Sequence, residues 1–415
     1  MSDITINNWY SSVVIYLLFC FPVVIGFVKV FGNLILFIIL FLGIIVAISQ
    51  KTSPFKIAAL RSFSFITVGY FLVMFLSIVF ANEPSTSFLH LGRKVHFMLA
   101  PFIALAIYQV NWDINRLLLS LKVGLIILGS IVLTQYFLGI ERPSGMINAN
   151  IFGDLVVMML FLSVVKVFEE NRQNRILTLS AVLMGLVAII LSCNRGSIIT
   201  LIILSTSFIF LNYNHYLRDQ KKHQLIVFIL FSIILCIFFS QQNVRDRVIL
   251  ANQEISQWIN NEHKNTSVGL RLEMWSSSLQ AFQDSPWIGV GYRNANIVVA
   301  RYADDKTKDA ISNFTHLHNE YITNLVSAGI LGLGTLLTLL IIPLRLFIKN
   351  IHHKELYFHS VMGIMLCIGY ASFGLTHIAF GEEHMNAFYV FFLSMLMPYV
   401  KKQELSSIMN KKWPP

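Results

Sequence analysis

The chain has 415 residues, of which 56% are hydrophobic and only 13% are charged. Its mean hydropathy of +0.68 excludes a water-soluble protein of this size. The formal net charge is +10. In a soluble protein that charge would suggest a nucleic-acid partner, so the positions of the basic residues decide its meaning.

Twelve apolar segments are candidate membrane spans, because a span needs about 20 apolar residues. They are residues 11–28, 31–49, 61–81, 95–110, 118–139, 151–168, 176–193, 197–213, 224–240, 321–345, 356–376 and 386–400. The first lacks a basic amino-terminal region and a small-residue cleavage site, so we expect it to be retained in the protein. The sequence thus predicts an all-α integral membrane protein with about 12 transmembrane helices.

One long polar loop interrupts these spans. We expect residues 1–240 to form spans 1–9, residues 241–320 a mostly helical loop domain, residues 321–400 spans 10–12, and residues 401–415 a tail. If the amino terminus is cytoplasmic, the cytoplasmic loops and tail carry 18 of the 31 Lys and Arg residues, and the short outer loops carry five. This asymmetry is the positive-inside bias of membrane proteins. It places both termini in the cytoplasm and the long loop outside, and it implies no nucleic-acid partner.

Several common chemistries have no motif here. The four cysteines, Cys20, Cys193, Cys236 and Cys367, lie in apolar segments without a CxxC pattern, so we interpret them as buried hydrophobic residues. Neither a GxxxxGK[ST] phosphate loop nor a GxGxxG motif after a strand is found. The energy for any reaction must therefore arrive in the substrate, and no cofactor is expected.

The long loop ends in Thr315-His316-Leu317-His318-Asn319-Glu320, directly before an apolar helix. A histidine can accept a proton near neutral pH, and a helix N-terminus disfavours its charged form. We therefore predict that His318 is a general base, whereas His316 is expected to form hydrogen bonds. A metal site is the less favoured alternative, because no HExxH motif or further ligand cluster accompanies the two histidines.

Other polar groups are expected on the same side of the membrane. The hairpin 142–150 brings Arg142, Asn148 and Asn150, and the last outer loop brings Glu383 and His384. Arg195 lies in a very short connection between two spans, where it either reaches lipid headgroups or binds phosphate oxygens.

Within the long loop, Arg271 opens a predicted helix. The apolar stripe of that helix, Leu272, Trp275, Leu279 and Phe282, is expected to pack against the protein. Residues 289–291, Gly-Val-Gly, predict a tight turn after the helix.

Together these segments resemble the O-antigen ligase and O-antigen polymerase superfamily. The resemblance is carried by residues 142–150, Asn194-Arg195-Gly196-Ser197, residues 271–275 and 286–291, His318-Asn319-Glu320-Tyr321, and Gly329-Ile330-Leu331-Gly332. Their order, their spacing and the twelve-span layout are similar, from about residue 140 to residue 335. Asn194 and Ser197 depart from the family pattern, which leaves the choice between ligase and polymerase open.

The resemblance implies a GT-C-like fold and an inverting, metal-independent glycosyltransferase at the periplasmic face of a Gram-negative inner membrane. The donor would be a glycan on undecaprenyl diphosphate, and the acceptor a lipid A–core sugar in a ligase or a second lipid-linked repeat in a polymerase. It implies catalytic roles for His318, Arg195 and Arg271. The residues expected to bind substrate are Arg142, Asn148, Asn150, Arg247, His316, Asn319, Glu320, Glu383 and His384.

We favour a ligase, because the runs around Arg271 and His318 look more like enterobacterial-type ligases. Two more distant alternatives are a flippase or other transporter and an oligosaccharyltransferase acting on protein. A transporter would place ionisable groups at mid-membrane. The candidates here, Asp154, His359 and His377, lie near span ends.

The topology has a direct test. Alkaline phosphatase fused after residue 260 should be active, because the long loop is expected outside, and a fusion after residue 405 should be inactive. The reverse pattern of activities would contradict the orientation and every site assignment that depends on it.

Overall fold

The structure is a computed structural model that describes residues 8–27, 30–80, 88, 91–192, 194–217, 242–292 and 294–412. The regular elements among these residues are helices. They are α1 (Asn8–Val24), α2 (Phe31–Ser49), α3 (Ala58–Val79), α5 (Val95–Tyr108), α6 (Ile114–Phe137), α7 (Ala149–Ser163), α8 (Arg172–Ser192), α9 (Arg195–Asn212), the π-helical turn η1 (Tyr213–Leu217), α11 (Gln242–Ile259), α12 (Ser267–Asp284), α13 (Ala295–Tyr302), α14 (Asp305–Asn313), α15 (Glu320–Asn350), α16 (Tyr357–Thr376) and α17 (Glu383–Lys412).

The all-α prediction is confirmed for this part of the chain. Six helices are long and apolar enough to cross a membrane, and four shorter helices are also apolar, so the protein is a multi-pass membrane protein. Each predicted span coincides with a described helix except 224–240, which lies outside the described residues. The number of twelve spans therefore stays a prediction.

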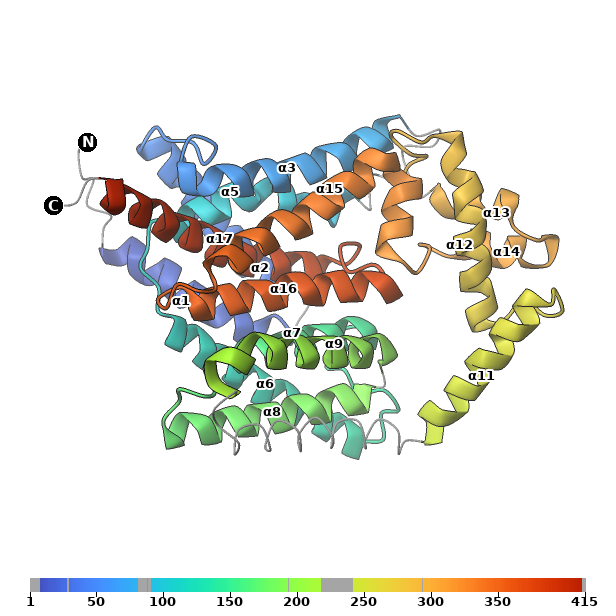
Figure 1. The fold of residues 1–415 in the computed structure, drawn as a ribbon, viewed down its shortest axis with the longest axis horizontal. Helices are drawn as coiled ribbons and strands as arrows, with labels where there is room; N and C mark the ends of the chain where they lie inside the picture. Colours follow the sequence, from blue (N-terminus) through green and yellow to red (C-terminus); the bar gives the residue numbers. More distant parts are fainter. Residues whose placement is uncertain are drawn as a thin grey trace.

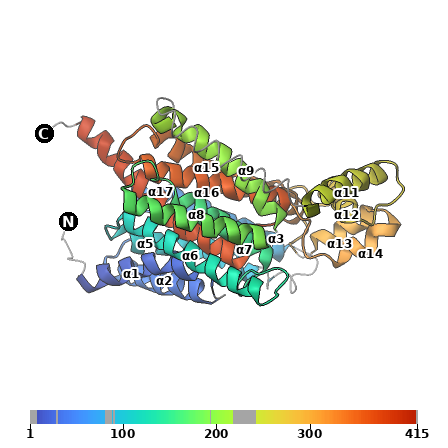
Figure 2. The same ribbon diagram turned by 90° about the horizontal axis from the view of Figure 1, so that it is seen from below.

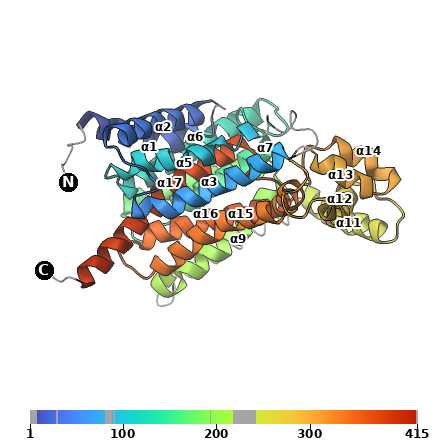
Figure 3. The same ribbon diagram turned by 90° about the horizontal axis from the view of Figure 1, so that it is seen from above.

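The membrane helices run side by side as one bundle, and α11–α14 gather at one end of it (Figure 1). We call residues 242–319 the loop domain. The start of α1 and the end of α17 lie at the opposite end of the bundle in the views from below and from above (Figures 2 and 3). Both chain ends are thus on the side away from the loop domain, as the predicted topology requires.

Asparagine side chains start three of the helices that reach the loop-domain end. The Oδ1 atoms of Asn148, Asn194 and Asn319 accept hydrogen bonds from backbone N–H groups in the first turns of α7, α9 and α15. Such caps satisfy donors that have no partner within the helix. The polar segments identified in the sequence therefore fix the residues at which these three helices begin.

The loop domain has a small core of its own. It includes Met274, Ala281, Val299, Ile311 and Leu317, and Val326 of α15 packs against it. A domain with this core can hold exposed side chains at fixed positions. Its contact with α15 links it to the bundle.

The predicted apolar stripe of α12 is a packing face only in part, because Trp275 packs against the loop-domain core but Leu279 does not. Leu279 is 66% exposed, whereas Met274 and Ala281 are buried together with Ser277 and Ser278. The buried side of α12 thus combines Met274 with small residues, and it covers only part of the stripe. The spacing of large apolar residues therefore marked the buried side incompletely.

Backbone pairing attaches the loop domain to a kink in α15. Residues Ala328 and Gly329 leave helical geometry within α15. Beside them, the N–H groups of Val290 and Gly291 donate to the carbonyl oxygens of Val326 and Ser327 at 3.1 and 2.9 Å. The predicted turn at residues 289–291 is thus a docking segment for the kink.

Glycine is required on both sides of this contact. Gly289 and Gly329 have φ values of 70° and 64°. A Cβ on Gly329 would lie 2.3 Å from the carbonyl carbon of Trp287, and one on Gly289 would lie 2.2 Å from that of Ser327. The Gly-x-x-Gly run of the sequence therefore serves close backbone approach at this point.

We predict that Gly329→Ala destabilises the protein by about 1–3 kcal/mol, because alanine disfavours this backbone conformation and its Cβ meets the backbone of Trp287. Gly334→Ala is the matched control, since a Cβ at Gly334 in the same helix would contact nothing within 4 Å. Thermal unfolding of the purified protein in detergent measures both variants. Equal melting temperatures for the two would refute the docking role of Gly329.

Candidate active site at the loop-domain end of the bundle

The two histidines of the sequence motif lie in the segment that connects α14 to α15. Within it, Leu317 is fully buried in the loop-domain core, and its carbonyl oxygen accepts a hydrogen bond from Trp275 Nε1 of α12 at 2.9 Å. This anchor fixes the residues on either side. The rings of His316 and His318 lie 4.5 Å apart between centroids, and Phe314 contacts His318 edge-on.

His318 has an uncommon backbone conformation. Its φ is 52°, one of three positive values among the described non-glycine residues. The left-handed region is costly for most side chains, although histidine enters it more readily than most. Such strain persists only where the surrounding contacts impose it, and it gathers at functional sites. His318 directly precedes Asn319, the N-cap of α15, so the prediction that it stands at the helix start is confirmed.

The pKa values of both histidines are lowered. Burial, together with the positive charges of Arg271 and His377, lowers the pKa of His318 from an ordinary 6.5 to about 4. Burial is also the main reason that the pKa of His316 falls to about 3, with His318, His377, Arg271 and Arg93 adding to it. Both rings are therefore neutral at neutral pH and able to accept a proton.

Arg271 supplies a cation beside these bases. It lies exposed in the first turns of α12, which Thr266 caps through a 3.0 Å hydrogen bond from Gly269 N to its hydroxyl. Because its charge acts on both histidines, Arg271 is one of the groups that surround them. Arg271 and His318, which the sequence resemblance named as catalytic residues, thus lie close enough to interact electrostatically.

A second set of polar side chains lies on the bundle side of the site. Asp154 of α7 is fully buried, and its Oδ1 accepts hydrogen bonds from Ser197 Oγ at 2.7 Å and Asn194 Nδ2 at 3.3 Å. Its Oδ2 lies 2.8 Å from His377 Nε2. We call Asp154, Asn194, Ser197 and His377 the Asp154 cluster. It joins the start of α9 and the end of α16 to α7.

Small residues make this convergence possible. A Cβ on Gly153 would lie 2.5 Å from Ser197 Oγ, and a Cβ on Gly196 would lie 2.8 Å from Thr376 Oγ1. The first turn of α9 therefore lies against α7 and the last turn of α16. Arg195, the first residue of α9, belongs to this place, although its side chain lies outside the described part of the structure.

Glu320 has a structural environment that the sequence did not suggest. It is buried, with Oε1 accepting from Asn324 Nδ2 and Oε2 accepting from the backbone N–H of Phe380, each at 2.8 Å. Lys94, which is also buried, donates to Tyr70 Oη and to the carbonyl oxygen of Phe380, each at 2.8 Å. These bonds hold the segment after α16 against α3 and α15, so both Glu320 oxygens already have partners.

Asn319 and the hairpin residues also make local contacts. The amide of Asn319 donates to the Leu375 carbonyl oxygen at 3.4 Å. Arg142 donates to Asn150 Oδ1 at 3.1 Å, and Asn194 Nδ2 donates to the carbonyl oxygen of Asn150 at 2.7 Å. The predicted hairpin residues thus connect to the Asp154 cluster, whereas Asn148 acts as a cap.

The remaining predicted residues are more scattered. Glu383 accepts a hydrogen bond from Asn33 of α2, and His384 is buried at the start of α17. Arg247 lies in α11, and its side chain is outside the described part of the structure. The structure therefore brings together His316, His318 and Arg271, and it adds His377 and Asp154. In the sequence, Asp154 and His377 were recognised only as ionisable residues near the ends of predicted spans.

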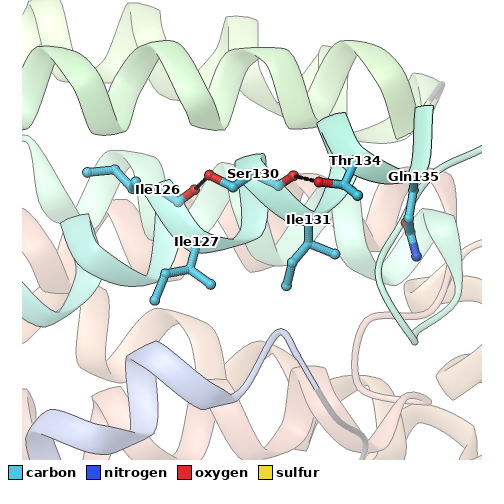
Figure 4. A pocket seen from close by; sticks show the side chains of 6 residues that line it. All are labelled: Ile126, Ile127, Ser130, Ile131, Thr134 and Gln135. Atoms are coloured by element: carbon cyan, nitrogen blue, oxygen red, sulfur yellow. Dashed lines mark hydrogen bonds between the residues drawn. The ribbon is translucent and has the colours of Figure 1, made fainter. Parts of the chain in front are cut away.

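An open groove of about 350 Å³ lies on α6, apart from the histidines (Figure 4). Its lining is Ile126, Ile127, Ser130, Ile131, Thr134 and Gln135. The hydroxyls of Ser130 and Thr134 donate to carbonyl oxygens of their own helix at 2.8 and 2.9 Å, so the groove presents an apolar surface. Gln135 ends it and accepts hydrogen bonds from the backbone N–H groups of Ser144 and Gly145. This surface suits a lipid chain and lacks groups for catalysis.

The electrostatic coupling in the site can be measured directly. Replacing Arg271 by Gln should raise the pKa of His318 from about 4 toward 6.5, because a positive charge beside the ring is removed. Diethyl pyrocarbonate modifies the neutral ring, so its reaction with His318 should start to fail at a higher pH in the variant when followed by mass spectrometry. Arg301→Gln, in the same loop domain, should leave the midpoint unchanged. The same midpoint in all three proteins would contradict the coupling.

Known proteins that are similar to this chain point to a family. The family model described as O-antigen ligase matches residues 179–337. An uncharacterized protein of Haemophilus influenzae is 24% identical over 332 residues, which cover 77% of this chain and 81% of that protein. The matched segment contains Arg195, Arg271 and His318, whereas Asp154 and His377 lie on either side of it. The match over residues 179–337 to the O-antigen ligase family confirms the resemblance found in the sequence.

Proposed function

We propose that the protein is a glycosyltransferase that moves a glycan from undecaprenyl diphosphate to a sugar hydroxyl at the periplasmic face of the inner membrane. The single observation that supports it most is the neutral His318 beside the cation Arg271, held at the end of the bundle where the spans meet the loop domain. A base and a cation are the two groups that this reaction needs.

The bond changes follow from the chemistry of the donor. The acceptor hydroxyl loses its proton to His318 while its oxygen forms a bond to the anomeric carbon. The bond from that carbon to the diphosphate breaks, and the electron pair leaves with the diphosphate. The leaving group needs positive charge and no proton, which Arg271 and Arg195 would supply. Attack opposite the leaving group inverts the anomeric centre.

The low pKa of His318 gives the donor a second role. In the free site, burial and neighbouring cations make His318 a weak base. A diphosphate bound among those cations would oppose their charge and raise the pKa of His318. His318 would thus become a stronger base only when the donor is bound. It would therefore activate an acceptor hydroxyl only once the donor is in place.

The acceptor divides the superfamily into its two reactions. We propose a lipid A–core sugar as acceptor, as in O-antigen ligases, and an undecaprenyl-linked repeat unit is the competing acceptor of a polymerase. The other residues predicted to bind substrate, from Arg142 to His384, would surround the sugars or hold the segments that do. In this assignment residues 241–320 are the periplasmic domain, and the apolar groove on α6 is a surface for lipid.

The test is glycan transfer by the purified protein in vesicles with the lipid-linked donor and each acceptor in turn. His318→Ala should abolish transfer, and His316→Ala should reduce it less. Arg195→Ala and Arg271→Ala should each lower the rate by about 10²–10³, since each removes a charge contact to the leaving group. Lysine should rescue poorly, because it lacks the two-pronged geometry of arginine.

The acceptor that receives the glycan decides between ligase and polymerase. EDTA should have no effect on the wild type, and lost turnover in EDTA would favour the metal alternative for the two histidines. Full turnover by His318→Ala would remove the general base from the mechanism. Near-normal turnover by either arginine variant would reduce that residue to a surface anchor.

A further inference from the structure

The Asp154 cluster contains a buried carboxylate that the mechanism above does not use. Asp154 is fully buried within the membrane bundle. A lone charge there is costly, so such groups are paired with an opposite charge or with several hydrogen-bond donors. Here Ser197 and Asn194 occupy Oδ1, and Oδ2 faces His377 Nε2 at 2.8 Å.

The surroundings of His377 favour its positive charge. His377 is the C-cap of α16, and the end of a helix carries partial negative charge. Burial is the largest single influence on the pKa of His377 and lowers it, whereas the charge and hydrogen bonding of Asp154 from α7 raise it. The carboxylates of Glu320 on α15 and Glu382 act in the same direction, so the pKa is raised. His316 and His318 face it from the loop domain and are neutral.

His377 is the member of the cluster that faces the site. Its side chain is 19% exposed, whereas that of Asp154 is completely buried. Its charge lowers the pKa of both His316 and His318, so it lies near both rings. The same site therefore holds histidines of opposite character. Burial and cations favour the neutral form of His316 and His318, whereas carboxylates favour the charged form of His377, which separates a base from a cation.

We propose that His377, fixed by Asp154, is a further cationic group of the site and binds the diphosphate of the lipid-linked donor. This inference rests on the proposed function for the identity of the donor. An imidazolium has two N–H groups. One is directed at Asp154 through Nε2, and the Nδ1–H is left for a diphosphate oxygen. When the bond between the anomeric carbon and oxygen breaks, the electron pair goes to that oxygen, and His377 keeps its proton.

A purely structural pair would also join α7 to α16, so the test must separate charge from hydrogen bonding. Gln at position 377 can still donate a hydrogen bond to Asp154 but carries no charge. Lys carries the charge without the ring. If His377 acts as a cation, Lys should replace it better than Gln, and if it only joins two helices, Gln should be at least as good as Lys.

Undecaprenyl diphosphate without a glycan is the probe, because it can bind but cannot react. Its affinity for the purified full-length protein at pH 7 should fall about tenfold or more in His377→Gln, which is what losing a hydrogen bond from a charged group typically costs. His377→Lys should restore most of the affinity, and Asp154→Asn should weaken binding as His377→Gln does. His359→Gln is the matched control, since His359 is a buried histidine at the start of the same helix, stacked on Tyr399.

The pH dependence gives a readout that a structural role would not change. His377 binds while protonated, so the affinity of the wild type should be present below the pKa of His377 and be lost as the pH rises through it. His377→Lys should keep its affinity over that pH range. Gel filtration and thermal unfolding show that each variant is folded before its affinity is compared.

The outcomes separate this inference from the proposed function. Equal affinities for His377→Gln and wild type, equal losses for the Gln and Lys variants, or no binding by the wild type would each overturn the role of His377. If the binding pattern holds but the wild type transfers no glycan to either acceptor, the transferase proposal fails and the diphosphate site stands. If transfer is normal in His377→Gln at every pH, the role of His377 fails alone.

Discussion

The close pairing of residues 286–291 with the kink of α15 is the contact on which the site depends. The loop domain carries Arg271, His316 and His318, whereas the bundle carries the Asp154 cluster and Arg195. The backbone at Gly289 meets the backbone at Gly329 without side chains between them, and this contact holds the loop domain against the end of the bundle. The bond from Trp275 to Leu317 then fixes the histidine segment on the docked domain. The position of the histidine segment at the end of the bundle thus depends on this backbone contact.

Electrostatics organises the site that this contact assembles. Carboxylates on the bundle side are fully occupied, Asp154 by Ser197, Asn194 and His377, and Glu320 by Asn324 and Phe380. The charged groups that act on His318 are the cations Arg271 and His377. An anionic substrate group is attracted to such a place, and the two neutral rings beside it remain free of protons. The arrangement suits a reaction whose leaving group is anionic and whose nucleophile must lose a proton.

Much of the fold could be predicted from the sequence, because apolar segments of about 20 residues have few alternatives to membrane helices. The start of a helix directly after His318 and the turn at residues 289–291 were also visible as local patterns. The stripe of α12 was right for Trp275 and wrong for Leu279, because the buried side of the helix also runs through Met274, serines and an alanine and leaves Leu279 exposed. Local periodicity cannot tell which side of a short helix its neighbours will cover.

The candidate site could also be predicted only in part, because local patterns do not identify partners that lie far apart in the chain. His318 and Arg271 lie in sequence motifs, and the resemblance named both as catalytic residues. The pairing of Asp154 with His377 joins residues far apart in the chain, and nothing near either one marks the other as its partner. Glu320 looked like a ligand for substrate beside a histidine motif, but its burial and its two hydrogen bonds depend on the position of Phe380. Such long-range partners follow only from the packed bundle.

The central claim is that the donor diphosphate binds among cations that adjoin the base, and the pKa of His318 with and without that anion tests it most directly. Modification of His318 by diethyl pyrocarbonate can be followed against pH in the purified protein, first alone and then saturated with undecaprenyl diphosphate. The account predicts that the midpoint lies near 4 in the free protein and moves to higher pH when the anion is bound. An unchanged midpoint in the saturated protein, with binding verified in the same sample, would contradict it.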